Sequence, residues 1–96
     1  MVLSPGPCNV CGELGWVLFV TALHNGEVFL ACNSCKAASD AAAYVGYWRA
    51  DGSQAVEEFA PDGVRAATEA EVESLGYDLA RAQRLRDAEF DILIGL

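Results

Sequence analysis

The sequence predicts a small α+β domain stabilised by a metal ion, and three observations support that prediction. The chain has only 96 residues, its four cysteines stand in two Cys-x-x-Cys pairs, and its pattern changes from strand-like to helix-like after the second pair. A chain this short buries only about 60–68% of the surface that its unfolded form exposes, so a staple is expected. We therefore expect one domain over residues 1–96, with a zinc finger over 7–45 and a second hairpin and helices over 46–96.

The first elements are a tether and a hairpin. Residues 1–7 contain two prolines and a glycine and offer little to bury, which predicts a tether. Residues 16–23 are β-branched and aromatic, which predicts a strand. Asn25-Gly26 is the strongest two-residue hairpin signal, because both central positions favour φ > 0. Residues 28–31 are then the return strand, which leads the chain to Cys32.

Two elements compete after Cys35. Alanines at helical spacing, with Asn33 or Ser34 as a cap and Gly46 as a stop, predict a short helix from about 34 to 44. The alternative is a second hairpin, with a strand over 44–48, a turn at Asp51-Gly52 and a return over 55–59. The two fit together if the helix ends near residue 43.

The last third of the chain is expected to be helical. Pro61-Asp62-Gly63 predicts a turn. Thr68 and Glu71 have the spacing of a capping box, so a helix should begin there and pause at Gly76. From Asp78 onward an apolar stripe predicts a second helix that must dock on another part of the chain. The stripe consists of Leu79, Ala82, Leu85, Ile92, Leu93 and Leu96.

The two cysteine pairs carry the chemistry. Cys8 and Cys11 are separated from Cys32 and Cys35 by twenty residues. Zinc prefers four soft ligands in a tetrahedron, and each Cys-x-x-Cys turn presents two thiolates on one side. Gly12 suits such a turn, since it lets backbone N–H groups point at sulfur. We predict one structural Zn²⁺ bound by these four cysteines, in a closed site with no open position for catalysis.

Other uses of the cysteines fit the pattern less well. A disulfide within a Cys-x-x-Cys pair would be strained, and disulfides between the pairs need an oxidising compartment. A thioredoxin-like pair would follow a strand, whereas Cys8 and Cys11 precede the strands. An iron–sulfur centre remains an alternative to zinc.

Residues 7–45 resemble the treble-clef and zinc-ribbon families of four-cysteine fingers, through the two knuckles and the hairpin between them. In a treble clef the hairpin leads to a helix whose first turn carries the last two ligands, which the alanines after Cys35 fit. Pairing centred on Asn25-Gly26 places Cys32 opposite Phe19 and leaves Cys11 outside the ladder. A symmetric ribbon would need a bulge, at Gly15. We lean to the treble clef and keep the ribbon open.

The charge of the chain bears on its partners. The net charge is −8, with only six basic residues. Nucleic-acid binding depends on Lys and Arg that neutralise phosphates, so this balance disfavours nucleic acid and anionic membranes and favours a basic protein partner. We expect an acidic protein–protein interaction module, for example an immunity or antitoxin-like protein. The alternative, which the family resemblance implies, is a nucleic-acid-associated zinc finger in transcription or translation.

The expected partner surface combines aromatic and acidic residues. Tyr and Trp anchor many interfaces, although in a thin core they are first of all core residues. Arg81, Arg84 and Arg86 are expected to pair along a helix with Asp78 and Asp87. The candidate partner-binding residues are Tyr44, Tyr47, Trp48, Glu57, Glu58, Asp62, Glu69, Glu71 and Glu73.

No catalytic set is predicted, so we do not expect an enzyme. His24 is the only histidine and lies beside the Asn25-Gly26 turn, where a solvated loop residue is expected. No signal peptide is visible, and the longest apolar run, 16–23, is far shorter than the ~20 residues that span a bilayer, which predicts a cytoplasmic protein. The apolar residues 90–96 either pack back on the finger or form a homodimer.

Overall fold

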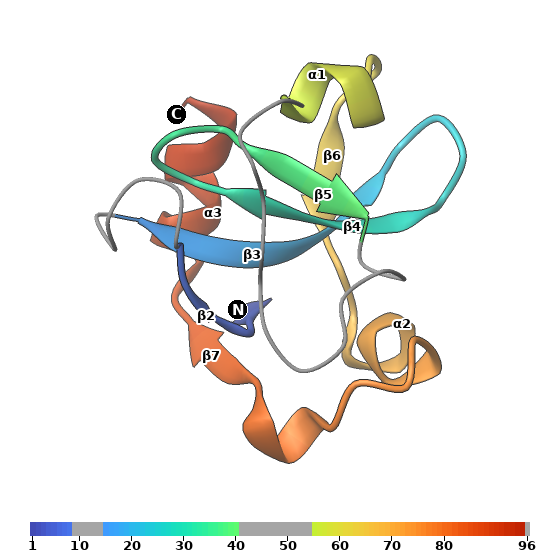
Figure 1. Ribbon diagram of the computed structural model, residues 1–96, viewed down its shortest axis with the longest axis vertical. Coiled ribbons are helices and arrows are strands. Elements are labelled where there is room, and N and C mark those ends of the chain that lie inside the picture. The colour runs from blue at the N-terminus through green and yellow to red at the C-terminus, as the bar shows by residue number, and fades with distance from the viewer. Residues whose placement is uncertain (9–14, 41–54, 96) are drawn as a thin grey trace.

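The computed structural model describes residues 1–8, 15–40 and 55–95, and these form a small α+β structure around a curled antiparallel sheet (Figure 1). This confirms the α+β part of the predicted fold class. The strands are β1 (Val2–Ser4), β2 (Gly6–Pro7), β3 (Trp16–Ala22), β4 (Val28–Cys32), β5 (Ala38–Asp40), β6 (Val64–Ala66) and β7 (Gln83–Leu85). The helices are α1 (Val56–Phe59), α2 (Glu69–Ser74), the 3₁₀ helix η2 (Leu79–Arg81) and α3 (Asp87–Ile94).

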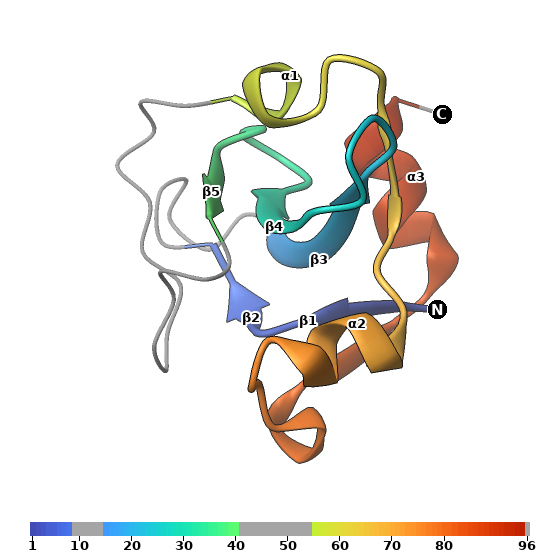
Figure 2. The same cartoon turned by 90° about the vertical axis from the view of Figure 1, so that its right-hand side faces the viewer.

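Strand β3 is the centre of the larger sheet. It pairs with β4 along one edge, and its other edge pairs with β2 near its start and with β6 near its end. Strand β5 adds to the far side of β4, and β1 and β7 form a separate two-stranded sheet. Figure 2 shows α1 above the larger sheet and α2 below it.

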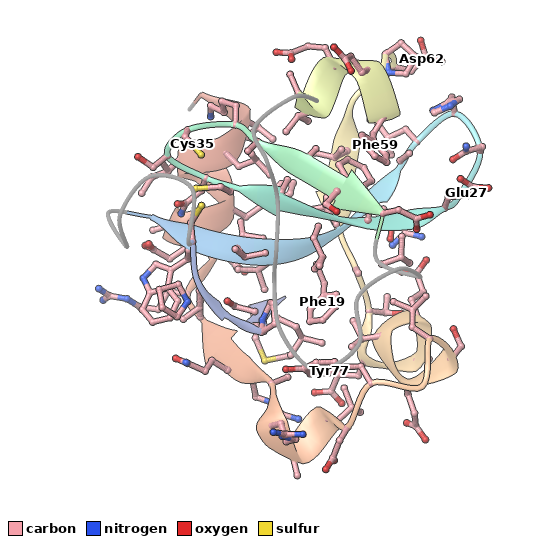
Figure 3. All side chains as sticks on the ribbon, in the orientation of Figure 1. Phe19, Glu27, Cys35, Phe59, Asp62 and Tyr77 are labelled. Carbon is pink, nitrogen blue, oxygen red and sulfur yellow. The ribbon has the colours of Figure 1, made fainter. Side chains whose placement is uncertain are left out.

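Both faces of β3 are buried, which explains its nearly continuous apolar run. Val17 and Phe19 face a cluster that includes Val72 of α2, and Tyr77 packs against it. Leu18 and Val20 face a second cluster, which α1 and α3 help to cover. The Phe19 and Tyr77 rings meet edge to face, with centroids 5.0 Å apart (Figure 3).

The prediction of an N-terminal tether is wrong. Residues 2–4 form β1, which pairs with β7 so that Val2 lies opposite Leu85, and β2 pairs with the start of β3. Val2 and Leu3 are buried in the two core clusters, one on each side. The two prolines and the glycine of this segment suggested a tether, but burial of Val2 and Leu3 makes it a strand.

The first hairpin is confirmed, but its register differs by two residues from the expected one. Cys32 lies opposite Val17, not opposite Phe19, because the loop runs from 23 to 27 instead of containing only two residues. Gly26 has φ = 72° and its amide donates to the carbonyl of Ala22, while the Asn25 side chain accepts from the amide of Glu27. The Asn-Gly pair thus makes the turn at a later position in a longer loop.

The predicted helix over about 34–44 is wrong over its described part. The chain enters β5, which pairs with β4 from Ala31↔Ala38 to Phe29↔Asp40. Small side chains suit this position, where Ala37 and Ala38 are buried. The expected second hairpin falls mostly outside the described residues, and its return over 55–59 is wrong, because only Ala55 bridges to Ala37 before α1 begins.

The C-terminal third is less helical than predicted. The turn at 61–63 and the capping box of α2 are confirmed, and Gly76 follows the helix with φ = 87°. The expected continuous helix from Asp78 is wrong, since η2 and β7 precede α3. The buried strand β1 needs a partner, and pairing with 83–85 overrides the helical propensity of that segment.

Among the described residues, none of the helices is long and apolar enough to cross a membrane.

Candidate metal centre

Three of the four predicted ligands come together at one end of the sheet. The Sγ atoms of Cys8, Cys32 and Cys35 all lie within 4.8 Å of one another, and those of Cys8 and Cys35 are 3.8 Å apart. Cys8 follows β2, Cys32 ends β4, and Cys35 lies in the turn between β4 and β5. Figure 3 shows Cys35 at this end of the sheet, near α3. The fourth predicted ligand, Cys11, lies outside the described residues.

Backbone pairing brings Cys8 to Cys32. The amide of Cys8 donates to the carbonyl of Gly15 at 2.9 Å, so the segment that leaves β2 stays paired with the segment that enters β3. Cys32 lies opposite Val17, near the start of β3. The register expected from the sequence placed it opposite Phe19, two residues further along the strand. The longer hairpin loop is therefore what aligns the two halves of the site.

Gly15 leaves space that the cysteine cluster uses. A Cβ atom at this position would lie 2.5 Å from the Cβ of Ser34, and 3.0 Å from both the Asn33 Oδ1 and the Cys32 Sγ. Any larger residue would push the second knuckle away from β3. The sequence singled out Gly15 only as the site of a bulge, since its role depends on the register of a strand 17 residues away.

The second knuckle has the hydrogen bonds that hold a thiolate in place. The amides of Ser34 and Cys35 point at the Cys32 Sγ, at 3.3 Å and 3.5 Å. Lys36 follows with φ = 62°, and its amide donates to the carbonyl of Cys32 at 3.2 Å. This left-handed residue turns the chain back into β5, which is why no helix follows Cys35.

Desolvation disfavours ionisation of the Cys32 and Cys35 thiols. Cys8 and Cys32 are fully buried, while Cys35 is exposed. Desolvation raises the pKa of the Cys32 thiol far above its ordinary value, and it raises the pKa of Cys35 as well. A bound cation would favour the thiolate over the thiol, because it binds the thiolate and displaces the proton.

The spacing of the sulfur atoms fits a tetrahedral metal. With metal–sulfur bonds of about 2.3 Å, two ligands of a tetrahedron are about 3.8 Å apart. The Cys8–Cys35 distance has this value, and it is almost twice the length of a disulfide bond. Within the described ranges Cys8, Cys32 and Cys35 form no disulfide. The cluster could therefore hold a metal ion.

The acidic candidates occupy two separate regions. Glu57 and Glu58 lie on α1, with Asp62 in the turn that follows it, whereas Glu69, Glu71 and Glu73 lie on α2. Figure 1 places α1 and α2 at opposite ends of the molecule, so the six carboxylates do not form one continuous face. The aromatic candidates Tyr44, Tyr47 and Trp48 lie outside the described residues.

Two of the three acids of α2, Glu69 and Glu71, are engaged within the fold. Glu71 accepts two bonds from Arg65, at 2.7 Å and 2.9 Å, one from the Thr21 hydroxyl and one from the amide of Thr68. The Arg65 guanidinium is the main reason why the pKa of Glu71 falls to about 2. Glu69 pairs with Arg84 at 3.1 Å.

The expected pairing of Arg81, Arg84 and Arg86 with Asp78 and Asp87 along a helix is wrong, because that helix does not form. Asp78 instead caps η2 through the amide of Ala80, and Asp87 pairs with the N-terminal amino group. His24 is an exposed loop residue, as expected.

No protein family, curated protein or solved structure matches this chain in the comparisons.

Proposed function

We propose that the chain binds one structural zinc ion through Cys8, Cys11, Cys32 and Cys35. The observation that carries this proposal is the convergence of three sulfur atoms, all within 4.8 Å of one another and with Cys8 and Cys35 at the 3.8 Å spacing of a tetrahedron, from segments far apart in the sequence. Cys11 supplies the fourth thiolate in the proposal, because it completes the first Cys-x-x-Cys pair. All-sulfur tetrahedral sites select zinc or iron, and zinc is the usual choice for a structural role.

The ribbon is the better description of the proposed finger. In the treble clef that we favoured from the sequence, a helix would carry the last two ligands. Cys32 and Cys35 instead flank a turn between two antiparallel strands, β4 and β5. Cys8 likewise follows a strand that pairs with β3.

We further propose that the protein acts without catalysis, as an acidic module that binds a basic protein. The support is the acidic corner formed by Glu57, Glu58 and Asp62, which make no ion pair within the part of the chain that the structure describes. A net charge of −8 strengthens the attraction of a basic partner over long range. Neutralisation of such a partner, as by an immunity protein or antitoxin, is the concrete form of the proposal, and a homodimer through residues 90–96 stays compatible with it.

Lys36 weakens the nucleic-acid alternative. It is the one basic residue close to a knuckle in the sequence, and its Nζ atom donates to backbone carbonyls of α3. A phosphate-binding finger would need such a cation to face the nucleic acid.

Partner capture tests the interaction proposal. The immobilised zinc-loaded chain is used to isolate basic proteins from a cell extract, and the affinity for the main captured protein is then measured between about 50 and 300 mM salt. The triple variant Glu57→Gln, Glu58→Gln, Asp62→Asn should weaken binding and flatten its salt dependence, while Glu69→Gln serves as the control. Salt-independent binding, or equal loss in both variants, would contradict the proposal.

A further inference from the structure

The second knuckle is bonded directly to the C-terminal helix. The Asn33 Nδ2 donates to the carbonyl of Glu89 at 3.0 Å. The Lys36 Nζ donates to the carbonyls of Ile92, at 2.9 Å, and Leu93. Two of the five residues of the segment that carries Cys32 and Cys35 thus bond to α3, although 56 or 57 residues separate each pair of partners in the sequence.

Asn33 is held by the start of β3 and reaches from there to α3. Its side chain is buried, with the Oδ1 accepting from the amide of Trp16 at 3.0 Å, and its own amide donates to the carbonyl of Trp16 at 3.0 Å. These two bonds continue the β3–β4 pairing by one residue beyond Val17 and Cys32. The contact of Asn33 with Glu89 therefore belongs to the hairpin, whereas Lys36 reaches α3 from the far side of the turn.

Lys36 provides a positive charge and a hydrogen-bond donor at the C-terminal end of α3. The carbonyls in the last turn of a helix have no partner within the helix, and a cation there also offsets the helix dipole. The last turn of α3 contains no basic residue, and its first turn carries Asp87 and Glu89. Since isolated helices shorter than about 12–15 residues are marginal in water, an eight-residue helix depends on such contacts.

Packing links the same helix to the core. Leu93 is buried, and Phe90 packs against the cluster that contains Val2 and Leu18. If α3 detached, these two side chains and the surface beneath them would become accessible.

We propose that the second knuckle is a metal-dependent latch for α3, and this inference rests on the proposed zinc site. The metal bonds to Cys32 and Cys35 fix the turn between them, and this turn positions Lys36, whose amide bonds to the carbonyl of Cys32, against the backbone of α3. Loss of the metal opens the turn and releases α3 before the β3–β4 hairpin comes apart. Metal occupancy is thereby converted into exposure of an apolar surface near the C-terminus.

Hydrogen exchange of the full, zinc-loaded chain tests the latch, with Lys36→Met and Lys36→Arg as matched variants. Both variants keep a Cβ at the left-handed position, so the backbone strain there is the same. Loss of the charged hydrogen bonds in Lys36→Met should speed exchange of the α3 amides about tenfold. The β3 and β4 amides should stay protected, and one zinc per chain should remain by native mass. Lys36→Arg should exchange like the wild type.

A second arm follows the wild type by pulsed exchange after a strong chelator is added. The latch predicts that α3 loses protection before β3 and β4. Simultaneous loss in all three, or unchanged α3 exchange in Lys36→Met, would overturn the latch while leaving the zinc site intact. A chain that carries no metal by mass would instead overturn the zinc site together with the latch.

Discussion

The two ends of the β3 strand are held by different chemistry. At its start, near Trp16, three cysteine sulfur atoms join the segments after β2, at the end of β4 and before β5. At its end, Thr21 bonds to Glu71, which also binds Arg65 of β6 and the N-terminus of α2. Distant segments meet at each end of the strand, three cysteine sulfur atoms at one end and a single carboxylate at the other.

The two ends differ in whether the chain itself supplies all of the interaction partners. The carboxylate end contains all of its own partners, and an ion pair as exposed as Arg65–Glu71 contributes little to stability because solvent screens it. The cysteine end gathers three thiols, and burial disfavours the charged form of the Cys32 thiol, so in our proposal this end depends on a cation from outside the chain. Structural zinc contributes on the order of 10–16 kcal/mol of apparent binding energy in small fingers. We therefore expect the cysteine end to dominate stability.

The largest effect should come from Cys32→Ser. The substitution removes the sulfur atom that accepts hydrogen bonds from the amides of Ser34 and Cys35. It should abolish zinc binding and the cooperative thermal transition of the chain. Zinc content by mass and the melting curve by circular dichroism would check this. A Cys32→Ser chain that melts like the wild type would make the comparison between the two ends untenable.

Gly15→Ala should give the next largest effect. The new Cβ would lie 2.5 Å from the Cβ of Ser34, and the resulting strain should cost about 1–3 kcal/mol and lower the affinity for zinc. Competition with a chromophoric chelator measures that affinity. Gly26→Ala is the control, since its Cβ meets nothing within 4 Å and only its positive φ is unfavourable. Equal zinc affinities in the two variants would show that Gly15 is not coupled to the site.

The carboxylate end should respond to pH. Glu71 has a pKa of about 2 in the folded chain, below the value near 4.5 of an unfolded glutamate. Its contribution to stability is therefore fully present above about pH 4.5 and is lost as the pH falls toward 2. Glu71→Gln should lower the urea midpoint at neutral pH and match the wild type near pH 2.

Glu73→Gln is the control for this titration, because Glu73 lies on the same helix and makes no ion pair with any described residue. If the two variants showed the same pH dependence, the network around Glu71 would not be the source of the effect.

The smallest effect should come from Arg84→Gln. The ion pair with Glu69 is about half exposed on both sides, so its loss should change stability by no more than about 0.5 kcal/mol. Melting curves of the Arg84→Gln variant and the wild type, recorded at low and at moderate salt, would check this. A loss comparable to that of Gly15→Ala would mean that surface charge, and not the cysteine end, sets the stability.

Local signals predicted the local elements of the fold. The apolar run at 16–22, the turn at Gly26 and the capping box at Thr68 each depend on residues close in sequence, and all three are present. The failures involve long-range pairing. Residues 2–4 become a strand because 83–85 pair with them, and 38–40 become a strand because β4 offers an edge.

The cysteine cluster was predictable from the sequence, but the way the fold builds it was not. The cysteine spacing pointed to Cys8, Cys11, Cys32 and Cys35, and the three of these that the structure describes, Cys8, Cys32 and Cys35, meet in space. The roles of Gly15, Asn33 and Lys36 had no signal in spacing, because each depends on a segment brought near by folding. The acidic residues are close in sequence and suggest one surface, but they lie on α1 and α2, which the fold places apart (Figure 1).

Native mass spectrometry before and after chelation tests the central claim most directly, with circular dichroism on the same samples. The account predicts one zinc per chain when the protein is purified without added metal, and loss of the folded signal when a strong chelator removes it. A folded chain without metal, lighter by the four hydrogen atoms lost in forming two disulfides or unchanged by the chelator, would contradict the zinc site.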